Sequence, residues 1–261
     1  MNTREIIPSG SGQVERRMEK LVQLERTVLE IARDFAPAVL ASSLSAEDMV
    51  LTDAILRLEA GIEIFTLNTG RLHPETLQLI DAVEERYGYR IRTFEPDPRE
   101  VSQFLSSHGD EAIYRSIALR KRCCEIRKLM PLAQALAGKR AWITGLRREQ
   151  SITRANVQER EFDAVHGLAK FNPLAHWSEA EVWNYIGAFG VPYNPLYDRG
   201  FRSIGCAPCT RPAWRCRATS WPASSAAGSG APGCSPSAMA RLPSPRSMPS
   251  GRSTRPRPRH G

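Results

Sequence analysis

The sequence has no run of about 18 apolar residues, the length that a membrane-spanning helix requires. The first 13 residues also lack the short apolar stretch of a secretory signal, because they are polar and carry both signs of charge. These two absences predict a protein without membrane contact that is located in the cytoplasm.

Lysine, aspartate and glutamate are absent from residues 211–261, which hold nine arginines. The whole chain has a formal net charge of +8, yet residues 1–210 contain 27 basic and 28 acidic residues. The positive charge therefore belongs to the tail, and the rest of the chain is close to neutral. Because a nucleic-acid-binding domain concentrates basic residues on its folded surface, the sequence does not predict one here.

The tail has a narrow composition, in which Arg, Pro, Ser, Ala and Gly supply 41 of its 51 residues. Such a segment buries too little apolar surface to offset the entropy lost on folding, so disorder is predicted. Translation of a GC-rich gene out of frame explains this composition better than a genuine basic tail. The chain is therefore divided into a flexible N-terminus (1–13), a folded domain (14–210) and a low-complexity tail (211–261).

Predicted strands and helices alternate through the first half of the chain. A helix is predicted first, over 14–35, and further helices have Ser45 and Ser178 as N-caps. The alternation predicts an α/β fold with a doubly wound, mainly parallel sheet. The predicted strands are 38–43, 62–69, 89–96 and 140–145, and the predicted helices between or after them are 45–59, 74–88 and 178–190.

Polar residues follow the carboxyl ends of the first two predicted strands. In open α/β sheets, ligands bind at this edge of the sheet. The first strand ends in serines before a helix N-terminus, whose free N–H groups favour an anion. A plain helix cap, or an ion pair between Arg71 and Glu75, is the alternative interpretation. The candidate ligand contacts are Ser42, Ser43, Ser45, Asn68, Thr69, Gly70 and Arg71.

A later strand ends in Gly145 and is followed at once by the basic residues Arg147 and Arg148, with Arg154 further on. Arginine can hold a phosphate or sulfate through two parallel hydrogen bonds. A solvated charged loop explains the same pattern, so both interpretations stay open.

Four of the six cysteines form two close pairs, Cys123-Cys124 and Cys206-x-x-Cys209. Two such pairs in a cytoplasmic chain indicate metal or redox chemistry rather than disulfides. Adjacent cysteines on a helix point about 100° apart, which suits the separate irons of an iron–sulfur cluster better than one tetrahedral zinc. Zinc and unligated thiols remain alternatives.

Six short segments of the sequence, in this order along the chain, match those of a known enzyme family. The chain resembles the iron–sulfur branch of the sulfonucleotide reductases, the assimilatory adenylyl-sulfate reductases. The resemblance covers about 30–210. The matching segments are SSLSAEDMV (42–50), LNTGRLHPET (67–76), Cys-Cys-Glu-Ile-Arg-Lys (123–128), GLRREQS (145–151), KFNPL (170–174) and SIGCAPCTRP (203–212).

The resemblance implies a fold like that of the ATP pyrophosphatases and a [4Fe–4S] cluster held by Cys123, Cys124, Cys206 and Cys209. It implies that Lys128 lies between this cluster and the sulfate of the substrate. The implied reaction is the reduction of adenosine 5′-phosphosulfate to sulfite and AMP in sulfate assimilation and cysteine biosynthesis. The implied reductant is thioredoxin or a glutaredoxin-like protein.

The chain departs from the family in two places. Ser45 stands where a glycine is common, and the Glu-Cys-Gly-Leu-His segment that carries the nucleophilic cysteine is missing. Cys216 and Cys234 have different neighbours, so the role is assigned to neither. This chain is therefore expected to bind substrate without turning it over.

Several alternatives stay open. One is a reductase for the 3′-phosphorylated sulfonucleotide, although the two cysteine pairs favour the unphosphorylated substrate. Another is a non-catalytic iron–sulfur or nucleotide-binding remnant. An adenylating ATP pyrophosphatase would need a double glycine that residues 42–48 lack. The sequence leaves a homo-oligomer open.

Overall fold

The fold is described from a computed structural model, in which residues 10–212 are placed. The predicted tail from residue 213 onward, with Cys216 and Cys234, lies outside the described residues, as do residues 1–9 of the predicted flexible N-terminus. Among the described residues, no helix is both long and apolar enough to cross a membrane.

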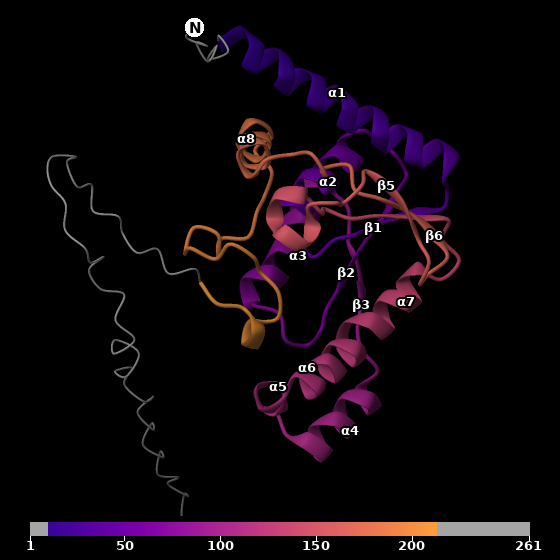
Figure 1. Ribbon diagram of the computed structural model, residues 1–261, viewed down its shortest axis with the longest axis vertical. Helices are drawn as coiled ribbons and strands as arrows, with labels where there is room; N and C mark the ends of the chain where they lie inside the picture. The colour runs from indigo at the N-terminus through magenta and orange to yellow at the C-terminus, as the bar shows by residue number, and fades with distance from the viewer. Residues whose placement is uncertain (1–9, 213–261) are drawn as a thin grey trace, which may run out of the picture. The chain divides into compact units, whose positions relative to one another are not determined.

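Six strands form one sheet in the order β3-β2-β1-β4-β6-β5. Four neighbouring pairs are parallel, and only β5 runs antiparallel, beside β6. This arrangement confirms the predicted doubly wound, mainly parallel α/β sheet (Figure 1). The strands are β1 Ala38–Ala41, β2 Glu63–Leu67, β3 Arg92–Phe94, β4 Ala141–Ile143, β5 Arg160–Asp163 and β6 Leu168–Phe171.

Helices cover both faces of the sheet because successive strand residues point to opposite sides. Leu40, Ile64 and Ile143 belong to the larger core, with residues of four helices. Val39 and Phe65 point the other way and pack against α7. The helices of the larger core are α1 Gly10–Asp34, α2 Ala46–Arg57, α3 Pro74–Tyr87 and α8 Glu179–Phe189, and α7 is Met130–Leu136.

A group of short helices lies beyond the end of β3 (Figure 1). Their small core contains Phe104, Ile113, Cys123 and Ile126. Residues Glu125–Leu129 form a π-helical turn between α6 and α7, and such turns occur often at functional sites. The helices of this group are α4 Pro98–His108, α5 Ala112–Arg115 and α6 Ile117–Cys124.

The predicted caps fix where the helices start. The hydroxyl of Ser178 accepts a hydrogen bond from the N–H of Glu181, and the carboxylate of Glu181 accepts one from the N–H of Ser178. The hydroxyl of Ser45 accepts from the N–H of Asp48, so Ser45 serves as the N-cap of α2. These caps confirm the expected starts of α2 and α8 and place both N-termini near the carboxyl edge of the sheet.

Candidate active site at the carboxyl edge of the sheet

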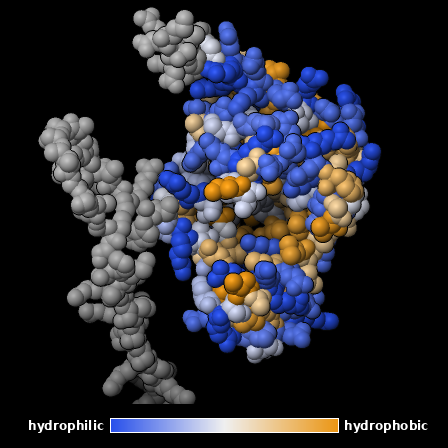
Figure 2. Space-filling view, viewed as in Figure 1, coloured by the Kyte–Doolittle hydropathy of each residue, from blue (hydrophilic) through white to orange (hydrophobic). Residues whose placement is uncertain are grey.

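Two adjoining cavities lie where β1, β2 and β4 end. The larger has a volume of about 710 Å³ and the smaller about 230 Å³. Both are lined by Ala41, Ser43, Thr144 and Ile204, which form a shared rim. A hollow edged by apolar side chains is visible on the face shown in Figure 2. The smaller cavity has mainly apolar walls, whereas charged side chains surround the larger one.

Asp48 ties together the two loops that follow β1 and β4. Its buried carboxylate accepts hydrogen bonds from the N–H of Ser43 (2.7 Å), the hydroxyl of Ser43 (2.6 Å) and the N–H of Gly145 (3.1 Å). A Cβ at Gly145 would lie 2.4 Å from this carboxylate, so the close approach requires glycine. Burial raises the pKa of Asp48, although its bonds with Ser43 act in the opposite direction.

Other N–H groups of the loop before α2 are also bonded within the protein. The N–H of Leu44 donates to the hydroxyl of Ser42 at 3.2 Å. The N–H of Ala46 donates to the phenol oxygen of Tyr197 at 3.1 Å. The predicted anion contacts Ser42, Ser43 and Ser45 thus lie at the loop that they were expected to form, and their side chains also shape that loop.

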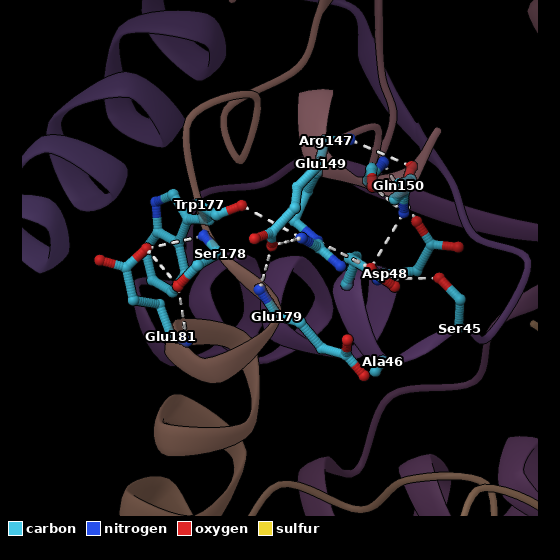
Figure 3. A network of polar contacts seen from close by, with 12 residues as sticks. Ser45, Ala46, Asp48, Arg147, Glu149, Gln150, Trp177, Ser178, Glu179 and Glu181 are labelled. Carbon is cyan, nitrogen blue, oxygen red and sulfur yellow. Dashed lines mark hydrogen bonds and ion pairs between the residues drawn. The ribbon is translucent and has the colours of Figure 1, made fainter. Parts of the chain in front are cut away.

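Arg147 forms a buried ion pair with Glu47 in the wall of the larger cavity. Its Nε donates to the Glu47 carboxylate at 2.8 Å, and the two side chains are 6% and 10% exposed. A further nitrogen donates to Glu149 (3.0 Å) and to the carbonyl of Trp177 (3.2 Å). Figure 3 shows how these contacts join Arg147 to the starts of α2 and α8.

The guanidinium of Arg148 points toward the loop at residue 157, where its Nε donates to the carbonyl of Val157 at 2.7 Å. Neither Arg147 nor Arg148 therefore keeps all its donors for a ligand, and their predicted role in anion binding stays a prediction. The partner of Arg147 is 100 positions away in sequence, so no local pattern could reveal it.

Residues 68–71, after β2, form a turn that contacts the cysteine segment. The amide of Asn68 donates to Glu95 (2.9 Å), and its oxygen accepts from the N–H of Gly70 (3.1 Å). The hydroxyl of Thr69 lies 3.2 Å from the sulfur of Cys206. Arg71 pairs with Asp110, whereas Glu75 pairs with Arg199 at 2.6 Å. The alternative of an ion pair between Arg71 and Glu75 is therefore wrong.

Three segments bring the cysteine pairs toward the same turn. Buried Arg127, just after Cys123-Cys124, donates to the carbonyl of Thr69 at 2.7 Å. On the other side, the N–H of Ala207 donates to the carbonyl of Arg71 at 2.8 Å. The hydroxyl of Tyr114 donates to the carbonyl of Pro208 at 3.0 Å, which joins α5 to the Cys206–Cys209 turn.

The four thiols differ in exposure. Cys123 and Cys206 are buried, Cys124 is half-buried and Cys209 is exposed, and none forms a disulfide. Burial raises the pKa of Cys123, while the positive charges of Arg127 and Arg71 lower it. Within residues 10–212, no three His, Cys, Asp or Glu side chains converge closely enough to hold a single metal ion. The arrangement thus gathers both pairs around residues 69–71 without forming a mononuclear ligand set.

Lys128 lies in the π-helical turn and lines the smaller cavity together with Cys206. Its ammonium has no hydrogen bond or ion pair with the residues that the structure describes, so it stays available as a positive charge. The role expected of Lys128, between a cluster and the substrate sulfate, stays a prediction. The bracing contacts of Asp48, Glu47 and Tyr197 were not predicted from the sequence. The only local signal for Asp48 was its position three residues after the cap Ser45.

Comparison with known proteins gives a consistent result. The chain matches the phosphoadenosine phosphosulfate reductase domain over residues 37–212. An adenosine 5′-phosphosulfate reductase from Burkholderia cepacia is 54% identical over 192 residues, covering 74% of this chain and 77% of that protein. One from Allochromatium vinosum is also 54% identical, over 182 residues, covering 70% and 71%.

Solved structures agree at the level of the fold. The phosphoadenylyl-sulfate (PAPS) reductase of Candida auris superposes with a TM-score of 0.63 at 24% identity, covering 78% of this chain and 99% of that one. The FMN adenylyltransferase of Candida glabrata gives 0.55 at 14% identity, covering 78% and 66%. These two structures show the fold alone, and the sequence match over residues 37–212 together with the 54% identical relatives shows that the chain belongs to the phosphoadenosine phosphosulfate reductase domain family.

Proposed function

We propose that this chain is an oxidoreductase-family protein that binds adenosine 5′-phosphosulfate, the substrate of a reduction that yields sulfite and AMP in sulfate assimilation. The observation that carries the proposal is that Lys128 and Cys206 line the smaller cavity at the carboxyl edge of the sheet, while Arg127, just after the other cysteine pair, bonds to the turn at Thr69. The names of the relatives from Burkholderia cepacia and Allochromatium vinosum support the unphosphorylated substrate.

The smaller cavity suits a nucleotide whose reactive end carries negative charge. Phe65, Leu67 and Trp142 supply apolar surface for a planar base. Lys128 and Cys206 line the same cavity, so a sulfate group there would lie beside a free ammonium. A positive charge at this point reduces the repulsion that an anionic nucleophile meets as it approaches the sulfur.

Cys123, Cys124, Cys206 and Cys209 would hold a [4Fe–4S] cluster. A cluster suits this donor set, because four free thiols come from two close pairs and neighbouring thiolates can each reach a different iron. When bound, the cluster adds fixed charge and rigidity near the sulfate. The buried guanidinium of Arg127 and the hydroxyl of Thr69 orient the cysteine segments in that arrangement.

Turnover requires a thiolate that attacks the sulfate sulfur, breaks its bond to the phosphate oxygen and releases AMP, which leaves the sulfo group on the cysteine. It also requires a dithiol, thioredoxin or a glutaredoxin-like protein, that frees this group as sulfite and is itself oxidised to a disulfide. The sequence contains no Glu-Cys-Gly-Leu-His segment to supply this thiolate. We therefore expect the chain to bind the nucleotide and the cluster but not to release sulfite. Thioredoxin-dependent sulfite release by this chain would contradict that expectation.

The cluster is tested on protein purified without oxygen. Iron and acid-labile sulfide are both expected at about four per chain. Cys206→Ser is expected to lose most of both, whereas the matched control Cys216→Ser, outside the two pairs, is expected to keep them. Zinc without acid-labile sulfide would overturn the cluster assignment, and failure to bind AMP would overturn the nucleotide assignment.

A further inference from the structure

One face of α1 carries a row of exposed apolar side chains. The residues of this row are Val14, Met18, Val22 and Leu29, and each side chain is between 47% and 62% exposed. Their spacing along the chain repeats with the turns of the helix, so they lie on one face of it. Single exposed apolar residues are ordinary on a protein surface, whereas a continuous row of them indicates a surface that binds another protein.

The first half of α1 has few contacts with the rest of the domain. Figure 1 shows α1 along the outside of the domain. In its second half Leu24, Val28 and Ile31 belong to the larger core, whereas residues 14–19 are all exposed. Lys20 forms an ion pair of 2.6 Å with α8. Because a short isolated helix is only marginally stable in water, a partner on this half would stabilise it.

Three charged residues lie beside the apolar row, on the side away from the larger core. They are Glu15, Glu19 and Arg26, which are exposed and have no ion pair within residues 10–212. The two acidic residues precede the basic one along the helix. The charged residue within the row itself, Glu25, is already paired with Arg57 at 2.8 Å.

This order of charges is complementary to a second copy of the same helix in one orientation. When two copies run antiparallel and cross near Val22, the apolar row of each lies against the row of the other. Glu15 and Glu19 of one copy then lie beside Arg26 of the other, and the same contact is repeated at the opposite end of the pair. In a parallel pair each charge would instead meet its own copy, which is repulsive.

We propose that this face of α1 is an interface between two copies of the chain, which associate as an antiparallel helix pair with two-fold symmetry. A helix pair about 36 Å long offers an interface at the low end of the usual size range, so the dimer is expected to dissociate in the micromolar range. The interface is separate from the proposed nucleotide site, since no residue of α1 lines either cavity.

The test is sedimentation velocity of the full chain, purified without oxygen, at concentrations from about 1 to about 200 μM. The mass is expected to rise from that of one chain, 29.1 kDa, toward twice that value as the concentration increases. The nine arginines of residues 211–261 are the same in every variant, so their contribution to association is common to all.

Two variants change the three charges without touching the core. Arg26→Glu makes all three negative, and the double variant Glu15→Arg with Glu19→Arg makes all three positive. Each variant alone should dimerise at least about tenfold more weakly than the wild type, because like charges then meet at both ends of the pair. Equimolar mixing of the two should restore association, because each then meets the opposite charge.

Arg90→Glu is the matched control, because it changes the net charge as Arg26→Glu does, at an exposed position beside the start of β3. This control should dimerise like the wild type. Far-UV circular dichroism should be the same for all variants, which separates loss of the dimer from loss of the helix.

Three results would overturn the interface. The first is the mass of a single chain over the whole concentration range. The second is a dimer that both charge variants leave as strong as in the wild type, because the contact then lies elsewhere. The third is a mixture of the two variants that stays as dissociated as each variant alone, which is incompatible with antiparallel pairing.

Discussion

In the wall of the larger cavity, the buried side chains of Glu47, Asp48 and Arg147 are hydrogen-bonded within the protein, whereas the thiols of the two cysteine pairs have few hydrogen-bond partners. Glu47, Asp48 and Arg147 join the loops that follow β1 and β4 through hydrogen bonds. Around the cysteines, the segments are held by Arg127 and by backbone contacts, and the one thiol hydrogen bond within residues 10–212 joins Cys206 to Thr69. Hydrogen bonds between buried polar side chains therefore stabilise the wall of the larger cavity, whereas the thiols of the cysteine pairs stay available to bind a group.

The largest effect is expected from breaking the buried ion pair. Arg147→Met leaves the Glu47 carboxylate buried without a cation and with only the amide of Gln150 as a donor (2.9 Å), which should lower the free energy of unfolding by about 3–5 kcal/mol. Urea unfolding followed by circular dichroism measures this change. The double variant Glu47→Gln with Arg147→Met should recover part of the loss, since no buried charge then remains. Wild-type stability of Arg147→Met would show that this region does not depend on the pair.

Filling the space beside Asp48 is expected to cost less. Gly145→Ala places a methyl group 2.4 Å from the carboxylate and 3.1 Å from the N–H of Asp48, so the two loops must shift. A loss of about 1–3 kcal/mol is expected. Gly187→Ala is the matched control, because nothing lies within 4 Å of its Cβ position in α8. The control should be as stable as the wild type or slightly more so, and equal losses in both variants would refute the explanation.

The cysteine region should respond more weakly to a similar test. Thr69→Val removes the hydroxyl that lies 3.2 Å from the Cys206 sulfur and accepts from the N–H of Arg71 at 3.3 Å. In metal-free protein, a loss of about 1 kcal/mol is expected in urea unfolding. Thr153→Val, at an exposed position, is the control and should change little. A loss as large as that of Arg147→Met would remove the contrast between the two regions.

The smallest effect is a change in how stability depends on pH. Because burial raises the pKa of Asp48, the folded protein holds that proton more tightly than the unfolded chain does. This contribution is fully present below the unfolded value of about 3.9 and is lost as the pH rises through the folded pKa. The stability of the wild type relative to Asp48→Asn should therefore fall as the pH rises above the unfolded value of about 3.9.

Thermal unfolding at several pH values measures this difference. Asp81→Asn removes an exposed carboxylate and should keep the wild-type pH dependence. If Asp48→Asn and wild type change in parallel with pH, then Asp48 keeps its ordinary acidity despite its burial.

The sequence predicted the sheet well because its signals are local. Alternating apolar segments, the caps Ser45 and Ser178, and Pro74 at the start of α3 each depend on neighbouring residues. The antiparallel hairpin of β5 and β6 was missed, since Arg160–Asp163 is polar and its exposed edge needs little apolar surface.

The positions of the loops at the site could be predicted from the order of the strands, whereas the side-chain contacts between these loops could not. The ends of β1, β2 and β4 follow from the order of the strands, so the expected positions of Ser43, Thr69 and Gly145 agree with the structure. The inward turn of Arg147 depends on Glu47, which another strand and helix bring close. Pairing between residues 100 positions apart leaves no periodic pattern in the sequence.

The π-helical turn at Glu125–Leu129 fixes how far α7 is rotated about the helix axis relative to α6, which continues into it. Before it, Cys123 faces the small core with Phe104, and after it Leu136 faces the sheet with Val39 and Phe65. One extra residue rotates the second half by about 100° relative to the first. Deleting a residue within the turn would restore a regular helix, and the two halves could then no longer both keep their present faces buried. A substitution changes Lys128, Cys123 or Cys124 singly, whereas a change in the length of this turn would change the direction of Lys128 relative to both cysteines.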